Sequence, residues 1–212
     1  MNTLQEFDKT KTLQFATATL IGIDEAGRGP LAGPVVACAC HLSPNQYIYF
    51  EDVNDSKKLT AHKREEIFER FSTLGVLYGV GFASAKEIDK LNILQATFLA
   101  MRRAAQKFYS IPHAFALIDG PHLVKDLPLR QEAVVDGDAK SLNIAAASIV
   151  AKVLRDRYMD TLDKLYPNYG FASHKGYGTA QHLAAIKNFG PCPEHRRTFA
   201  PIRSLARPSL FP

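Results

Sequence analysis

Two acidic residues, Asp24 and Glu25, stand side by side directly after a short apolar run at residues 19–23. They lead into a turn rich in glycine and proline, in which Gly27 and Gly29 let the backbone approach a ligand closely. Open α/β sheets bind ligands beyond the carboxyl ends of their strands, so this spacing favours a ligand site. A solvated acidic turn is the competing interpretation.

The same pattern recurs twice further along the chain. Asp119 and Gly120 follow an apolar run, and Asp136 and Asp138 flank a glycine after another. A lone Asp at a strand end is usually a turn former. Carboxylates that converge from neighbouring strands would instead repel each other and raise each other's pKa. A hard divalent cation such as Mg²⁺ or Mn²⁺ resolves that conflict, and two such ions catalyse in-line displacement at phosphate.

Short apolar runs and helical patterns would hold these acids in place. The expected strands are residues 19–23, 35–40, 76–82, 115–118 and 133–135. The expected helices are residues 61–74, 143–165 and 180–188, the last of which follows Thr179. A further helix is expected to begin at the capping-box pair Ser84 and Glu87 and to carry apolar residues on one face as far as Phe108. Their order predicts an α/β fold in which three strands form a meander and later strands join through a helical crossover.

The composition predicts one folded domain with an uneven charge. The chain has 212 residues, of which 46% are hydrophobic, and its formal net charge is +5. All of that excess lies in residues 174–212, where six basic residues accompany Glu194 alone, so this basic extension indicates a polyanionic partner. Cys38, Cys40 and Cys192 are too few for a disulfide framework, the polar N-terminus lacks the pattern of a signal peptide, and the longest apolar stretch is too short to span a bilayer. We therefore expect a reduced, cytoplasmic monomer with no membrane partner.

Five motifs occur in order along the chain. They are D-E-A-G-R-G-P at residues 24–30, N-D-S-K-K-L at 54–59, I-D-G at 118–120, A-A-S-I-V-A-K at 146–152, and Y-G-F followed by H-K-G-Y between 169 and 177. Together they resemble bacterial ribonuclease HII. The resemblance runs from about residue 18 to R-T-F at residues 197–199, which is nearly the whole chain.

The resemblance implies a ribonuclease H-like fold, with a mixed five-stranded sheet, flanking helices and a C-terminal helical extension. It implies one catalytic domain over residues 1–212, whose basic extension begins near residue 174. The activity implied is endonucleolytic cleavage of the RNA strand of RNA–DNA hybrids and nicking 5′ to ribonucleotides embedded in duplex DNA. Hydrolysis with two Mn²⁺ or Mg²⁺ ions would leave 5′-phosphate and 3′-hydroxyl ends.

The resemblance also assigns the acids. The positions that match the family's metal ligands are Asp24, Glu25, Asp119 and Asp138. Asp156 matches a further acid near the site. The family often has Lys-Gly-Asp where this chain has D-G-D, so a second acid replaces a basic residue. Asp138 fits the family's offset to Tyr177 and Asp156, but Asp136 could share a strand face with it.

The resemblance assigns two substrate readers and a helix face. The loop Gly27-Arg28-Gly29 would read the ribose 2′-hydroxyl, chiefly through backbone contacts. Tyr177 would stack on the sugar of the following deoxynucleotide, so that the pair tests for RNA on one side and DNA on the other. Ser148 and Lys152 are four residues apart on one helical face, which looks toward the site in the family pattern.

Other basic residues are weaker candidates. Lys57 and Lys58 precede a helix and could contact phosphates. The same role is expected of His174 and Lys175 and of His195, which stands beside Arg196 and Arg197. A solvated surface is the competing interpretation for Lys57 and Lys58.

Two other functions are alternatives to the ribonuclease. A DNA-directed nuclease or junction resolvase of similar fold would use the same carboxylates, but it has no need of a 2′-hydroxyl reader. A catalytically silent binding module would not concentrate acids at its strand ends, because nucleic-acid phosphates are negatively charged. Among relatives, the ribonuclease HIII branch is disfavoured because few residues precede Asp24.

Overall fold

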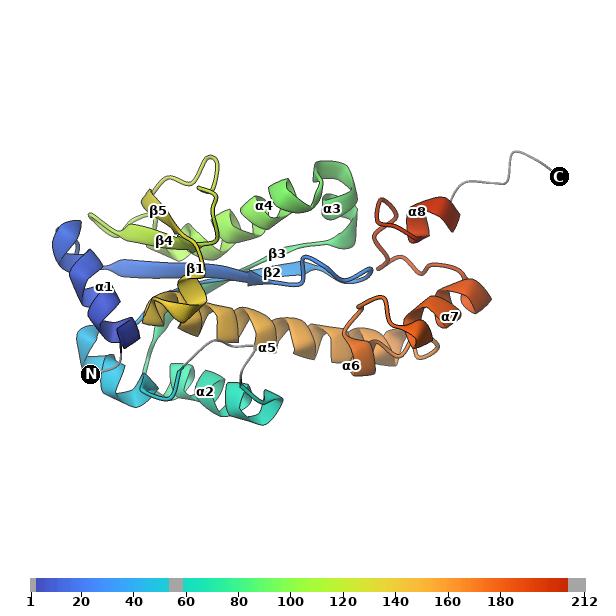
Figure 1. Cartoon of the computed structure of the whole chain (residues 1–212), viewed down its shortest axis with the longest axis horizontal. Helices are drawn as coiled ribbons and strands as arrows, with labels where there is room; N and C mark the ends of the chain where they lie inside the picture. The colour runs from blue at the N-terminus through green and yellow to red at the C-terminus, as the bar shows by residue number, and fades with distance from the viewer. Residues whose placement is uncertain (1–2, 54–58, 206–212) are drawn as a thin grey trace.

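The computed structural model describes residues 3–53 and 59–205, and a mixed sheet forms its centre (Figure 1). Its strands are β1 (Leu20–Ala26), β2 (Val35–His41), β3 (Leu77–Ala83), β4 (Phe115–Asp119) and β5 (Arg130–Val134). They lie in the order β3-β2-β1-β4-β5, with β1 antiparallel to β2 and parallel to β4. The prediction of a meander followed by a helical crossover is therefore confirmed.

Helices cover both faces of the sheet (Figure 1). On one face lie α3 (Ala85–Leu91) and α4 (Ile93–Ala105); along the other runs α5 (Leu142–Leu165), with α2 (Ala61–Thr73) outside it. The other helical segments are α1 (Thr3–Gln14), η1 (Pro44–Phe50), η3 (Gln106–Phe108), η4 (Gly137–Ala139), α6 (Phe171–His174), α7 (Ala180–Phe189) and α8 (Ile202–Leu205). The last three lie beyond one end of the sheet, opposite α1, as the C-terminal extension (Figure 1). No helix in the described ranges combines the length and apolar character needed to cross a bilayer.

Strand alternation sorts the side chains into two core layers. Ile21 and Ile23 of β1 pack with Met101 in the layer beneath α4. Cys38 and Cys40 of β2 lie on the other face and pack in the layer that includes α5. The two cysteines therefore share one buried face of the strand.

Gly22 lets α5 lie unusually close to β1. A Cβ atom at this position would be 2.1 Å from the carbonyl carbon of Asn143, in the first turn of α5. Only glycine permits this approach, because a real Cβ cannot come so near a backbone atom. Asp24, two residues further along β1, therefore faces the next turns of the same helix.

The element boundaries differ from the prediction in three places. The stripe expected to run from Ser84 to Phe108 is divided at Asn92, which has a φ of 70° and caps α4 with its side chain. Strand β1 extends through Asp24 and Glu25 to Ala26, whereas the strand was expected to end at residue 23, just before these acids. The fifth strand starts at Arg130, before the expected residues 133–135, because its pairing with β4 begins opposite Phe115.

Candidate active site

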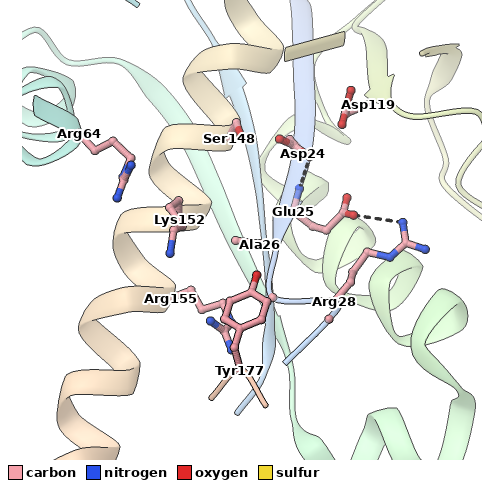
Figure 2. Close-up of a pocket in the computed structure, with 12 residues that line it drawn as sticks. Asp24, Glu25, Ala26, Arg28, Arg64, Asp119, Ser148, Lys152, Arg155 and Tyr177 are labelled. Atoms are coloured by element: carbon pink, nitrogen blue, oxygen red, sulfur yellow. Dashed lines mark hydrogen bonds and ion pairs between the residues drawn. The ribbon is translucent and has the colours of Figure 1, made fainter. Parts of the chain in front are cut away.

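Asp24 and Glu25 point to opposite sides of β1, because successive side chains of a strand alternate. Asp24 follows Leu20 and Gly22 on the α5 side, whereas Glu25 lies on the side of α4 and reaches toward Arg28 (Figure 2). The parallel pairing of β1 with β4 ends at Ile23 opposite Ile118, so the next residues are Asp24 and Asp119. Both acids therefore emerge at the same edge of the sheet.

Asp24 is the most deeply buried acid of this group, with 5% of its surface exposed. Its Oδ1 accepts a 2.6 Å hydrogen bond from the backbone N–H of Glu25, and the Ser148 hydroxyl on α5 also bonds to its carboxylate. Burial raises the pKa of Asp24 well above its ordinary value, and the charges of Glu25 and Asp119 raise it further. The two hydrogen bonds offset only part of this effect.

Glu25 has a cationic neighbour in the same turn. Its Oε1 lies 3.3 Å from Nη1 of Arg28, whose side chain is about half exposed. Burial raises the pKa of Glu25, and Arg28 opposes that rise only in part. The pair is long and Arg28 is about half exposed, so it stabilises the charge of Glu25 only weakly, and a divalent cation could replace Arg28 as its partner.

Asp119 is held by the segment that carries Asp138. Its Oδ1 accepts a 2.7 Å hydrogen bond from the backbone N–H of Gly137, and the N–H groups of Asp138 and Gly120 also bond to its carboxylate. Burial is the largest cause of its raised pKa, and the charge of Asp138 adds to it. Asp138 is therefore close to Asp119 and is itself buried, whereas Asp136 is exposed in a left-handed turn with a φ of 54°.

A pocket of about 420 Å³ opens beside these acids (Figure 2). Its lining residues are Asp24, Glu25, Ala26, Gly27, Arg28, Gly29, Arg64, Asp119, Ser148, Lys152, Arg155 and Tyr177. The structure thus gathers most of the expected site residues around one cavity. Asp138 and Asp156 are outside this lining, and Asp156 forms a 2.6 Å ion pair with Lys152. Lys57 and Lys58 lie outside the described residues.

Two arginines at the pocket were not expected from the sequence. Arg64 of α2 points toward Lys152 of α5 at one side of the pocket (Figure 2). Arg155 of α5 is 1% exposed and donates hydrogen bonds to the carbonyl oxygens of Pro34, Ala32 and Lys175. Neither residue stands in a motif with diagnostic spacing, so only the tertiary fold reveals their position.

The expectation that His174 and His195 contact phosphates is wrong. Both are buried, as is the neighbouring Arg196, and the polar atoms of all three bond to the protein itself. Nε2 of His174 bonds to the carbonyl of Tyr169, and Arg196 bonds to backbone carbonyls beneath the glycine turn. Such polar groups are retained inside a protein because internal acceptors replace water. Lys175 remains near the surface, where it pairs with Asp160.

The acids have the chemistry of a site for divalent cations. Their oxygens are hard donors, and their raised pKa values show negative charge that the protein leaves partly uncompensated. Among the described residues, however, no three His, Cys, Asp or Glu side chains are already gathered closely enough to hold a metal ion. Glu25 is turned toward Arg28, and Asp119 toward the amides of η4. The donor set therefore fits a cation, and binding requires these side chains to reorient.

The mixed β3-β2-β1-β4-β5 sheet, with acids where β1 and β4 end and basic side chains across the pocket, defines a nuclease of the ribonuclease H-like class. The family model of ribonuclease HII matches residues 21–202. The ribonuclease HII of Syntrophotalea carbinolica is 54% identical over 184 residues, which cover 87% of this chain and 86% of that protein. The chain belongs to the ribonuclease HII family, as its motifs indicated.

Solved structures agree with this fold. The crystal structure of ribonuclease H2 from Pyrococcus horikoshii matches with a TM-score of 0.67 at 28% identity, covering 88% of this chain and 96% of that one. A structure described as Bst-RNase HIII in complex with Mn²⁺ has a TM-score of 0.70 at 18% identity, covering 92% and 71%, and shows the fold alone. Members of the ribonuclease HII family are metal-dependent endoribonucleases that cleave the RNA of RNA–DNA hybrids and ribonucleotides in DNA.

Proposed function

We propose that this chain nicks duplex DNA on the 5′ side of embedded ribonucleotides and cleaves the RNA strand of RNA–DNA hybrids. One observation carries the proposal. Asp24 and Asp119 follow the last paired residues of two parallel neighbouring strands and line a pocket that the Gly27-Arg28-Gly29 loop and Tyr177 also line. Hydrolytic groups and a means of reading the sugar therefore share one cavity.

The ligands proposed for two Mn²⁺ or Mg²⁺ ions are Asp24, Glu25, Asp119 and Asp138. Oxygen-only donors suit these hard ions. When bound, the ions would supply a nucleophile at neutral pH and stabilise the departing 3′-oxygen, which gives 5′-phosphate and 3′-hydroxyl ends. Asp138 is preferred to Asp136 because it is buried beside Asp119, whereas Asp136 is exposed to solvent.

The residues around the acids would hold the substrate. Ser148 orients the carboxylate of Asp24 through its hydrogen bond. Arg64 and Lys152 line the pocket on the side of α2 and α5, where their positive charges would attract backbone phosphates. Arg64 and Lys152 would bind substrates of any base sequence, because a contact to a phosphate does not distinguish one base from another.

The loop and Tyr177 would read the junction between RNA and DNA. A Cβ atom placed on Gly29 would lie 3.6 Å from Cε1 of Tyr177, so the loop and the ring are adjacent in the lining of the pocket. The Tyr177 side chain is 49% exposed, which leaves its ring available for a sugar. The 2′-hydroxyl is the group that separates ribose from deoxyribose, and the loop would recognise it chiefly through its backbone.

The decisive experiment uses a duplex that contains a single ribonucleotide, together with a DNA duplex of the same sequence. With Mn²⁺ or Mg²⁺ present, we expect one nick 5′ to the ribonucleotide and none in the all-DNA duplex. Equal cutting of both would support a DNA-directed nuclease or junction resolvase. Asp119→Asn should abolish nicking while binding of the hybrid survives, and full activity in that variant would contradict the assignment.

A paired substitution identifies the fourth ligand. Asp138→Asn should abolish nicking, whereas Asp136→Asn should retain it, because only Asp138 lies beside Asp119. The reverse result would assign the ligand role to Asp136.

The proposal includes a monomeric, single-domain enzyme that works in the cytoplasm. Its three cysteines are buried free thiols, which is typical of a reducing compartment. Light scattering of the purified enzyme and its fractionation from cells would test these two points.

A further inference from the structure

Two buried residues that are neighbours in the sequence each hold one of the two proposed readers. Arg196 donates from Nη1 to the carbonyl of Arg28 at 2.8 Å and from Nη2 to the carbonyl of Gly27 at 2.5 Å. His195 contacts His182, which in turn bonds to the carbonyl of Tyr177. A single segment is therefore linked by hydrogen bonds to both readers.

Arg196 sets the direction in which the loop presents its N–H groups. In a planar trans peptide, the carbonyl oxygen and the following N–H point in opposite directions. Because Arg196 binds the carbonyls of Gly27 and Arg28, the N–H groups of Arg28 and Gly29 point away from it. Arg196 does not line the pocket but the loop does, so these two donors lie on the side where a ribose hydroxyl or a phosphate would bind.

The histidines form a chain whose proton positions are determined by their partners. Nδ1 of His182 lies 2.9 Å from the carbonyl of Tyr177 and must carry a proton. Nδ1 of His195 accepts the backbone N–H of Cys192 at 3.0 Å, so the proton of His195 is on Nε2. That proton is donated to Nε2 of His182 at 3.0 Å. One neutral arrangement satisfies every group, and burial, which lowers the pKa of His195 to about 4, keeps it neutral.

The segment that carries both residues is itself fixed to the strand-end turn. The backbone N–H of Arg196 donates to the carbonyl of Leu31 at 2.9 Å, and Ala32 forms an isolated β-bridge with His195. The guanidinium of Arg196 also donates to the carbonyl of Gly33. Movement of this segment would displace the loop and Tyr177 together, whereas loss of one side chain would release only one of them.

We propose that His195 and Arg196 are positioning residues that set the separation between the 2′-hydroxyl-reading loop and Tyr177, and with it the specificity for an RNA–DNA junction. This inference rests on the proposed function. A junction substrate needs both readers at the correct separation, because one contacts the ribonucleotide and the other the following deoxynucleotide. A continuous RNA strand does not place deoxyribose against Tyr177, so its cleavage depends less on that separation.

The test compares kcat/KM on a duplex with one embedded ribonucleotide and on an RNA–DNA hybrid whose cut strand is all RNA. Arg196→Met should lower the preference for the junction by 10- to 100-fold, the range expected from a small misplacement of binding groups. Arg203→Met removes a charge from an exposed position of the same C-terminal segment and should leave the preference unchanged.

A second pair of variants tests the histidine side and does not depend on Arg196. His195→Phe keeps a ring of similar size but loses the hydrogen bonds of the imidazole to His182 and Cys192, so it should reduce the preference. His195→Gln retains one donor and one acceptor and should restore much of it. In a Tyr177→Ala background, His195→Phe should have no further effect on the preference, because the reader that it positions is gone.

The outcomes separate this inference from the proposed function. If the unmodified enzyme fails to nick the junction duplex, the proposed function is wrong. A second outcome is that the unmodified enzyme nicks that duplex while Arg196→Met and His195→Phe lower kcat/KM by the same factor on both substrates. In that case the two residues only stabilise the fold and the inference is overturned. The inference also fails if the effect of His195→Phe on the preference persists in the Tyr177→Ala background. Urea unfolding of each variant measures the stability change separately.

Discussion

Asp119 raises the pKa of Asp24, its neighbour at the end of the adjacent parallel strand. Both carboxylates are largely removed from water, and the hydrogen bonds from Ser148 and the amides of η4 compensate their charge only in part. The folded protein therefore holds like charges together at a cost in stability. Functional sites commonly contain such perturbed groups, because the arrangement that favours a ligand differs from the one that favours the fold.

The first prediction is that Asp24→Asn makes the metal-free protein more stable and abolishes its activity. Asparagine keeps an oxygen to accept the N–H of Glu25, and its amide can donate to Ser148, so no buried group loses its partner. The repulsion with Glu25 and Asp119 disappears. We expect a higher urea midpoint in EDTA and a fall in nicking of about a thousandfold or more, since a proposed metal ligand is lost.

Asp52→Asn is the matched control for this variant. Burial alone would raise the pKa of Asp52, but hydrogen bonds from Arg70 and Lys63 outweigh burial and lower that pKa. The charge of Asp52 is therefore favourable in the folded state. This substitution should reduce the urea midpoint and leave nicking intact. Equal shifts in both variants would show that the repulsion at the site is not the cause.

The second prediction concerns metal removal and salt. Mn²⁺ or Mg²⁺ should raise the melting temperature of the unmodified protein, because an ion that binds only the folded state stabilises it. The double variant Asp24→Asn with Asp119→Asn should show a much smaller rise.

Affinity for the hybrid should fall when the metal is chelated and also as salt increases, since counterions are released on binding. Binding that is independent of metal would contradict this electrostatic account.

The third prediction separates fold from function within the glycine loop. A Cβ on Gly29 meets only the ring of Tyr177, at an ordinary contact distance of 3.6 Å, whereas a Cβ on Gly27 would lie 2.0 Å from Nε of the buried Arg155. Gly27 also has a φ of 96°, which disfavours any other residue. Gly29→Ala should therefore leave stability within about 1 kcal/mol, or increase it, and Gly27→Ala should cost more than that.

Nicking assays complete the comparison of the two glycines. Gly29→Ala narrows the gap between the loop and Tyr177, in which the sugar is proposed to bind, so we expect kcat/KM on the junction duplex to fall although the protein stays folded. Normal nicking by Gly29→Ala would place the sugar elsewhere in the pocket.

Residue pattern and order were sufficient to predict the sheet and its acids. Period-two alternation located β3, an apolar run after the glycine and proline turn located β2, and acids that follow apolar runs indicated the carboxyl-terminal parts of β1 and β4. Helix α1 was not predicted, since its buried residues include the polar Gln5 and Asp8 and give no apolar stripe. The division at Asn92 was missed because the apolar positions continue past it, and only the positive φ shows the break.

The basic residues show a different limit. Residue type suggested that His174 and His195 contact phosphate, whereas the fold buries both of them against internal hydrogen-bond partners. Arg64 gave no signal, because its place at the pocket depends on how α2 packs outside α5. The role of a charged side chain depends on the groups around it in the fold. Those groups come from segments that are far apart in the sequence, so residue type alone does not predict the role.

The fourth prediction rests on Asp8, a fully buried acid in α1. Its Oδ2 accepts hydrogen bonds from the backbone N–H of Asn143 at 2.9 Å and from Nδ2 of the same residue at 2.8 Å. Its Oδ1 has no hydrogen-bond partner among the described residues. Burial raises the pKa of Asp8 to about 6, and the bonds to Ser141 and Asn143 limit the rise. This carboxyl joins α1 to the first turn of α5, on the same helix that carries Ser148.

The direction of the pH dependence follows from this raised pKa. The folded state binds the proton of Asp8 more tightly than the unfolded chain, whose pKa is about 4, so stability is greatest below that pH and falls as pH rises through about 6. The full loss amounts to about 3 kcal/mol at 1.4 kcal/mol per pH unit. Asp8→Asn cannot ionise, so its free energy of unfolding should decline less between pH 4 and 7. Urea titrations of the unmodified protein and of Asp8→Asn in EDTA give the two free energies of unfolding at each pH. The contributions of the other acids are the same in both proteins and cancel in the difference. Parallel profiles would show that water or a rearranged partner already solvates Asp8.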